Sequence, residues 1–209
     1  MSSQALDDSR YAGITEQGNM EVRKALLKAL GKDTEQSLVT RLADAFTERR
    51  FGKEDPILLS GERWREVLFI GQGMLRLCYS DRDGREFNKG FFREGQLIWP
   101  IAPGARQAPS LFSILCLEPC SVWITDFEWF RQQLESVGLW SRFALPFTEW
   151  LAEEKFLREY ELLLYPAMDR YWRFRNQCPE LADRVPDYHL ASYLGMSNVT
   201  LSRIKRGRF

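Results

Sequence analysis

The spacing of hydrophobic residues changes along the chain and divides it into helical and strand-like segments. Over residues 21–30 apolar positions recur every three or four residues and Gly31 follows, which predicts a short amphipathic helix with a glycine stop. Asp33 and Gln36 have the spacing of a capping box, which predicts a second helix over 38–46. Residues 1–18 show no such period, so we expect them to form a loose N-terminal arm.

After these helices the pattern becomes that of strands. Short runs rich in β-branched, aromatic and leucine residues are separated by turn signals, and DRDG (81–84) is typical of a hairpin turn. Many short strands with regular turns predict an antiparallel β-roll, whose interior can hold a small molecule. The predicted strands cover 51–59, 66–79, 85–92, 95–99, 111–117 and 121–125.

Helical spacing returns at Asp126, first as a short helix to residue 137 and then as a longer one. Pro146 is expected to kink the longer helix or to begin it. Its aromatic stripe can pack on the roll or pair with its twin across a two-fold axis. We expect a dimer seam, because one roll should not need so many large aromatics. The predicted seam residues are Trp140, Phe143, Phe147, Trp150 and Leu157.

The final segment, 187–206, has the spacing of two short helices joined by a tight turn. Ala191 is small enough for a close helix crossing, and Gly195 supplies the left-handed backbone that ends the first helix. An ordinary helical hairpin could share these two features. Leu201 and Ile204 in register, followed by a basic end, favour a helix-turn-helix that binds DNA.

The outward face of the second helix suits the DNA major groove. Arginine can pair with guanine and asparagine with adenine, and valine can contact a thymine methyl group. Ser197 is predicted to be the N-cap, where its hydroxyl can also contact a phosphate. The predicted DNA-contacting residues are Ser197, Asn198, Val199, Thr200, Ser202, Arg203, Lys205 and Arg206.

Charge is distributed unevenly, although the net charge is zero. Residues 166–209 carry eight Lys/Arg and four Asp/Glu, whereas the other 165 residues carry 21 and 25. This asymmetry indicates a sensing part joined to a DNA-facing part. No segment has the apolar length of a membrane span, and the start lacks a signal-peptide hydrophobic run. We therefore expect a cytoplasmic protein without a membrane partner.

The residues that usually carry catalysis or bind metals are few. His189 is the only histidine, and it lies in the predicted helix-turn-helix, so the roll lacks the ligands of a cupin-type enzyme or a haem sensor. Cys78, Cys116, Cys120 and Cys178 lack the close paired spacing of a zinc or iron–sulfur site, and we interpret them as buried apolar residues. We predict no catalytic residue, no metal and no cofactor.

The order of two helices, a roll, a long helix and a helix-turn-helix resembles the Crp/Fnr family of bacterial transcription regulators. EVLFIGQGMLRLCYSDRDGREFNKGFFREGQLI is similar to the family's roll. YPAMDRYWRFRNQCPELADRVPDYHLASYLGMSNVTLSRIKR is similar to its DNA-binding domain, especially in Bacteroidetes-type members. The resemblance implies an α+β fold. The implied parts of the chain are the arm (1–18), a β-roll sensor domain with flanking helices (19–137), a dimerisation helix (138–165) and a helix-turn-helix domain (166–209).

By resemblance, the protein is a homodimeric transcription regulator whose partners are double-stranded DNA, RNA polymerase and a small-molecule effector. The family's base-reading positions fall on Asn198, Val199 and Arg203, and its phosphate-contacting positions on Ser197 and Thr200. The family's best-known member has arginine and glutamate at the first two positions, so we expect a different target sequence. The alternative function is a ligand-sensing roll that acts through protein contacts with a degenerate helix-turn-helix.

The effector site departs from the family pattern. The cyclic-nucleotide cassette of the family has Gly-Glu-Leu, whose glutamate holds the ribose, and a later arginine that holds the phosphate. Here Gln96 replaces the glutamate, Ser110 falls at the arginine position and Arg106 lies nearby, so these three are the candidate effector-pocket residues. Without the arginine we expect no tight cyclic AMP binding. Four possibilities for the signal that the roll senses stay open. They are an apolar ligand, another metabolite, a redox switch at Cys116/Cys120, and a roll that has lost sensing.

Overall fold

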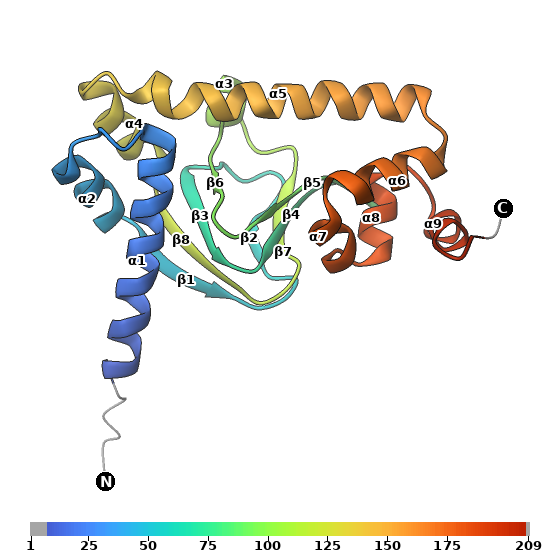
Figure 1. Cartoon of the computed structure of the whole chain (residues 1–209), viewed down its shortest axis with the longest axis horizontal. Helices are drawn as coiled ribbons and strands as arrows, with labels where there is room; N and C mark the ends of the chain where they lie inside the picture. Colours follow the sequence, from blue (N-terminus) through green and yellow to red (C-terminus); the bar gives the residue numbers. More distant parts are fainter. Residues whose placement is uncertain (1–7, 208–209) are drawn as a thin grey trace, which may run out of the picture.

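A computed structural model describes residues 8–207, with side chains from Gly18 onward. It confirms the expected α+β class: antiparallel sheets with helices before and after them. Figure 1 shows the roll beneath one long helix, with the C-terminal helices at the far end of that helix. The helices are α1 (Asp8–Leu30), α2 (Gln36–Asp44), α3 (Pro103–Gln107), α4 (Phe127–Ser136), α5 (Trp140–Leu164), α6 (Ala167–Gln177), α7 (Pro179–Arg184), α8 (Asp187–Tyr193) and α9 (Asn198–Lys205).

Two four-stranded antiparallel sheets form the roll, in the orders β1-β8-β3-β6 and β2-β7-β4-β5. The DRDG hairpin is confirmed: β4 pairs with β5, and Gly84 has a φ of 77° in the turn. The strands are β1 (Thr47–Phe51), β2 (Pro56–Leu58), β3 (Glu66–Gln72), β4 (Met74–Ser80), β5 (Glu86–Arg93), β6 (Leu97–Ile98), β7 (Ser113–Cys116) and β8 (Cys120–Asp126).

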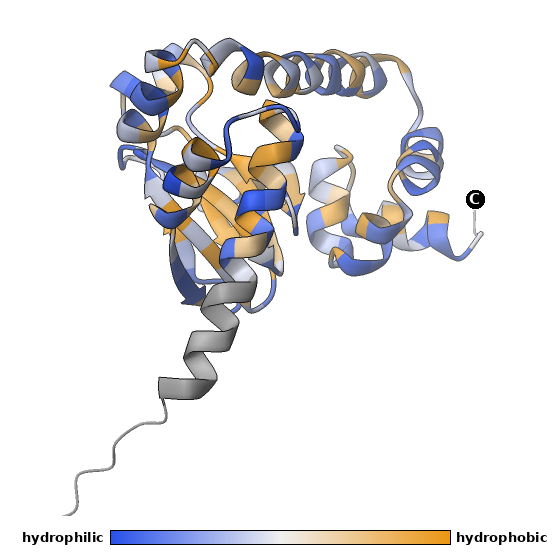
Figure 2. Ribbon diagram, turned by 60° about the vertical axis from the view of Figure 1, so that its left-hand side comes forward, coloured by the Kyte–Doolittle hydropathy of each residue, from blue (hydrophilic) through white to orange (hydrophobic). Residues whose placement is uncertain are grey.

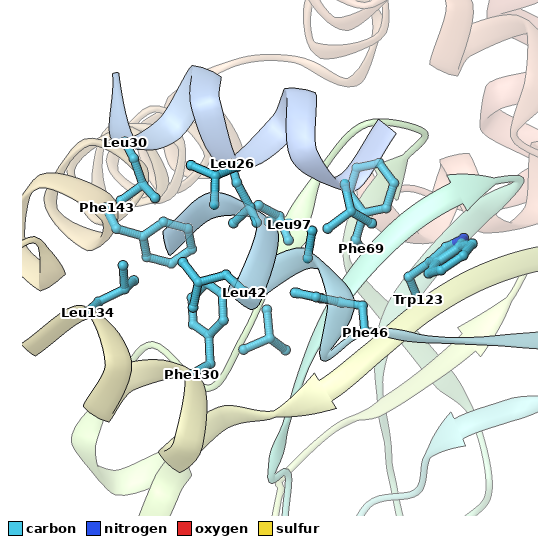
Figure 3. Packing of buried hydrophobic residues seen from close by; sticks show 14 of the residues in the cluster. Leu26, Leu30, Leu42, Phe46, Phe69, Leu97, Trp123, Phe130, Leu134 and Phe143 are labelled. Atoms are coloured by element: carbon cyan, nitrogen blue, oxygen red, sulfur yellow. The ribbon is translucent and has the colours of Figure 1, made fainter. Parts of the chain in front are cut away.

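Three hydrophobic clusters hold the chain together. The first lies where α1, α2, α4 and α5 cover one sheet, with Leu26, Leu42 and Phe130 among its buried members (Figure 3). The second fills the space between the two sheets, whose strands are largely coloured as hydrophobic in Figure 2. The third joins α6–α9 to Met74 and Leu117 of the roll. The C-terminal helices therefore pack on the roll as well as on each other.

Several local predictions were wrong. The part of the expected loose arm from Asp8 onward is helical, because α1 begins there, and residues 1–7 lie outside the described part of the chain. The capping box does not form: Glu35 is the N-cap of α2, and Asp33 instead accepts hydrogen bonds from Arg142. The helix α5 does not begin at Pro146, since it starts at Trp140 and continues through the proline.

Candidate nucleic-acid interface

The turn between α8 and α9 has the predicted geometry. Gly195 adopts a φ of 65°, and the backbone N–H of Met196 donates to the carbonyl of Ala191 at 3.0 Å, which closes the end of α8. A Cβ atom on Gly195 would lie 2.6 Å from Cδ2 of Leu162, so the end of α5 also approaches this position closely. The backbone conformation therefore favours glycine here, and a larger residue would also displace the end of the Leu162 side chain.

One face of α9 is anchored in the third hydrophobic cluster. Leu201 and Ile204 are buried against Leu190 and Ala191 of α8. Ser197 caps the helix, since its Oγ accepts from the backbone N–H of Thr200 at 3.1 Å. The cap and the buried face fix which residues of α9 point outward.

The predicted DNA-contacting residues lie in this helix and at its two caps, Ser197 and Arg206. Thr200 and Ser202 are half-buried, and the other six are exposed. Arg203 and Arg206 have no acidic partner among the described residues, whereas Lys205 pairs with Asp187 of α8. Two cations of α9 are therefore available to an anionic partner, and a third would have to leave an ion pair.

Sequence reasoning missed Arg170, which holds the turn in place from α6. Its Nε donates to the carbonyl of Leu194 at 2.8 Å, and its Nη2 donates to that of Gly195 at 3.1 Å. Its Nη1 donates to the carbonyl of Tyr165 at 2.5 Å, where α5 ends. One guanidinium thus joins the long helix to the turn before α9. No sequence signal separates Arg170 from Arg173 in the same helix.

Sequence reasoning also missed the contact between the roll and the C-terminal helices. The backbone N–H of Asn88 on β5 donates to Oγ of Ser192 on α8 at 3.0 Å, and that hydroxyl donates to the carbonyl of Glu86. The side-chain amide of Asn88 lies 3.2 Å from Nδ1 of His189. Burial lowers the pKa of His189 to about 4, and the positive charge of Arg76 acts in the same direction.

An ion-pair cluster reinforces this contact at the roll's edge. Arg184 of α7 pairs with Glu94, which follows β5, and with Glu118, which precedes β8. Hydrogen bonds from Arg184 lower the pKa of Glu94. Both carboxylates lie in turns that are distant in sequence, which is why the pattern of the chain could not pair them with Arg184.

The structure does not gather the candidate effector residues around one ligand site. Arg106 donates to the carbonyls of Pro100 and Ile101 and lies over the ring of Phe127. Ser110 is buried, and its hydroxyl bonds the backbone of its own loop. Gln96 accepts from a backbone N–H of its own turn and lines a different cavity, between the roll and the C-terminal helices. Each of the three side chains therefore has a local structural role.

The cysteine pair lies at the turn between β7 and β8. Cys116 and Cys120 are both buried and form no disulfide. This agrees with their interpretation as buried apolar residues. A hydrogen bond between their thiols raises the pKa of Cys116 and lowers that of Cys120. Within the described part of the chain, no cluster of His, Cys, Asp and Glu could hold a metal ion.

The residues of the predicted dimer seam on α5 lie in two different environments. Phe143 is buried within the chain, where its ring stacks on Trp99 at 4.8 Å, so it is not available to a second protomer and that assignment was wrong. Trp140 and Phe147 are half-buried against the same cluster, because the start of α5 covers the roll. Trp150 and Leu157 line the cavity between α5 and the C-terminal helices.

A different stripe of α5 is exposed within residues 8–207, where its Tyr160 ring contacts the ring of Tyr165 at 5.5 Å. Leu145, Phe156, Tyr160 and Leu163 are exposed by 54%, 71%, 51% and 75%, and their spacing of 11, 4 and 3 residues places them on one face. Sequence reasoning did not name these residues, because α5 is apolar on more than one side and the pattern alone does not show which side the roll covers.

Comparison with known proteins identifies the roll. Residues 48–137 match the family model of the cyclic nucleotide-binding domain, whereas no curated protein matches the chain in sequence. The chain is similar in structure to the c-di-GMP responsive global regulator CLP of Xanthomonas campestris, at 14% identity and a TM-score of 0.67, over 83% of this chain and 91% of that one. It is also similar to FixK2 of Bradyrhizobium japonicum, at 20% identity and a TM-score of 0.65, over 78% and 83%.

A mutant of CooA from Carboxydothermus hydrogenoformans is a third neighbour, at 16% identity and a TM-score of 0.61, over 88% of this chain and 83% of that one. At such identities the likeness establishes the fold. Residues 48–137 are thus similar to a cyclic nucleotide-binding domain. The chain's structural neighbours are regulators of the Crp/Fnr family, as the resemblance in sequence implies. No helix within residues 8–207 has both the length and the apolar character that a membrane span requires.

Proposed function

We propose that this protein is a sequence-specific DNA-binding transcription regulator of the Crp/Fnr type. The observation that carries the proposal is the two-sided construction of α9. Leu201 and Ile204 anchor one side, while Asn198, Val199 and Arg203 are exposed on the other. A capped helix with hydrogen-bonding residues near its start and unpaired arginines near its end is suited to enter the major groove.

A gel-shift assay with genomic fragments at two salt concentrations tests this proposal. Binding should be sequence-selective and should weaken steeply with salt, because phosphate contacts release counterions. Arg203→Ala should reduce specific affinity by ~1–3 kcal/mol if Arg203 pairs with a guanine. Arg175→Ala is the matched control, because Arg175 lies in α6, outside α9, and pairs with Asp183. No shift at either salt concentration would favour a module that acts through protein contacts.

We further propose a homodimer that pairs through the exposed α5 stripe of Leu145, Phe156, Tyr160 and Leu163. Large apolar side chains that are more than half exposed on one helix face are typical of an interface. A dimer also supplies the two α9 helices that successive major grooves, ~34 Å apart, require. In this arrangement a small rotation about α5 changes the spacing and therefore the affinity for an operator.

Light scattering after size-exclusion chromatography tests the dimer. Phe156→Asp combined with Leu163→Asp should give a monomer, because each protomer would place two charges on the apolar face. Leu111→Asp is the control, since Leu111 is 78% exposed and belongs to the loop before β7, not to α5. A dimer that persists in the double variant would contradict this choice of face.

A further inference from the structure

A cavity of about 670 Å³ lies between β5, α5 and the C-terminal helices. Its walls come from the roll (Gly90–Arg93), the middle of α5 and helices α6–α8, so all three parts of the fold line it. The volume is in the range of small-molecule sites. None of the roles described above for α9 or for the exposed α5 stripe accounts for it.

Two cations in this cavity have no acidic partner among the described residues. Lys155 donates only to the backbone carbonyl of Lys89, at 3.1 Å. Arg158 donates through Nη2 to the carbonyls of Tyr193, at 2.9 Å, and Asn88, while its Nε is buried without a partner. Both side chains are half-buried, where an unpaired charge is costly.

The carboxylates that line the cavity do not neutralise these cations. Glu161 pairs with Arg173, and Glu180 pairs with Arg93. Glu154 lies next to Lys155 in the chain but forms no salt bridge with it within the described residues. The cavity therefore has a local excess of positive charge, which favours an anion.

The electrostatics of Lys155 favour an anionic neighbour. Burial is the largest cause that lowers its pKa, to about 8, and the charges of Lys89 and Arg158 lower it further. Glu154 acts in the opposite direction but does not compensate. An anion that contacted the ammonium group would offset the repulsion and raise this pKa.

Aromatic side chains form much of the apolar part of the wall. Trp150, Phe91, Phe174 and Tyr193 line the cavity, and the Tyr193 ring lies 5.3 Å from Phe91 and 5.5 Å from Phe174. The guanidinium of Arg158 lies 4.8 Å above the Tyr193 ring, at the border between the cationic and apolar parts. This division suits a ligand that has an acidic group at one end and a ring or aliphatic body at the other.

We propose that this cavity binds a small organic anion, with its acidic group between Lys155 and Arg158 and its apolar body against Trp150, Phe174 and Tyr193. A ligand there would contact the roll, α5 and the helices that carry α9 at once. Binding of such a ligand would regulate the protein by changing the position of α9, and this consequence rests on the proposed function. The binding itself does not rest on it.

Fluorescence titration with two probes on the full-length protein tests the binding. The anionic probe is 8-anilinonaphthalene-1-sulfonate, and the neutral one is N-phenyl-1-naphthylamine, which has the same ring system without the sulfonate. Lys155→Met should weaken binding of the anionic probe by about tenfold or more, which corresponds to ~1.4 kcal/mol or more, because a charge-assisted contact is lost, and should leave the neutral probe unchanged. Lys32→Met is the matched control, because Lys32 is exposed and outside the cavity.

Equal affinity of the anionic probe for Lys155→Met and Lys32→Met would overturn the proposal, as would equal affinity of the wild type for the two probes. The pH dependence of the wild type gives a second measurement that needs no variant. Anionic-probe affinity should decrease as pH rises through about 8, because Lys155 loses its charge there. A flat profile between pH 7 and 9.5 would count against the site. Neither measurement uses DNA, so failure of the proposed DNA binding would leave this result interpretable.

Discussion

Acidification should weaken the contact between the roll and α8 through His189. The imidazole is 4% exposed, and its Nδ1 lies 3.2 Å from the side-chain amide nitrogen of Asn88. Because that nitrogen can only donate, Nδ1 must accept, and the ring is neutral with its proton on Nε2. Protonation of Nδ1 would place two donors face to face and a charge near Arg76. The folded contact therefore requires a neutral ring.

The magnitude follows from the two pKa values. The folded pKa of His189 is about 4 and its ordinary value is 6.5. The unfolded chain therefore holds more protons between these pH values, so the free energy of unfolding decreases as pH falls from 6.5 to 4. At ~1.4 kcal/mol per pKa unit, the loss amounts to at most about 3 kcal/mol. Burial is the main cause, with Arg76 and Lys53 acting in the same direction and Glu54 and Glu86 opposing them.

Urea unfolding of the wild type and of His189→Gln between pH 4 and 7 measures this effect. Most carboxylates titrate equally in both proteins, so the difference between their stabilities isolates His189. As pH falls from 7 to 4, we expect the wild type to lose about 2–3 kcal/mol of unfolding free energy relative to the variant. His189 is the only histidine, so its ring signals in an NMR titration give the folded pKa directly. A constant stability difference, or a ring that titrates near pH 6.5, would refute the reasoning.

Three further predictions concern the turn and the roll. Gly195→Ala should lower the free energy of unfolding by about 1–2 kcal/mol, because its φ of 65° strains a side chain; thermal unfolding measures this, and an unchanged melting temperature would contradict the turn geometry. Arg170→Met should lower it by about 2 kcal/mol in the same assay, whereas Arg175→Met should have a much smaller effect, because Arg170 bonds three backbone carbonyls. Isothermal titration should detect no micromolar or tighter binding of cyclic AMP, since the Ser110 hydroxyl bonds its own loop; such binding would require another phosphate partner.

The α8–α9 turn was predictable because its requirements are local. Gly195, the Ser197 cap and the spacing of Leu201 and Ile204 depend on neighbours within a few residues, and the structure has each as the pattern indicated. The same holds for the DRDG hairpin. Local backbone geometry and helical periodicity are properties of short segments, so the sequence alone determined them.

What lies on each side of α5 was decided by tertiary structure. The helix is apolar on more than one face, and only its position over the roll shows that Phe143 is buried while Phe156 and Leu163 are exposed. Asp33 likewise had the spacing of a cap, yet it bonds Arg142, 109 residues away. Such choices depend on partners that the fold brings together, and the spacing of residues along the chain carries no information about those partners.

The sequence by itself therefore determined the helix–roll–long helix–helix-turn-helix order and the outward face of α9, but not β1, α3 or α7. The tertiary structure decided how that face connects to the rest of the molecule: Arg170 tied to the turn, His189 against β5, and Lys155 with Arg158 in one cavity. The physical reason is that a charged or polar side chain acquires its role from the groups that burial places around it.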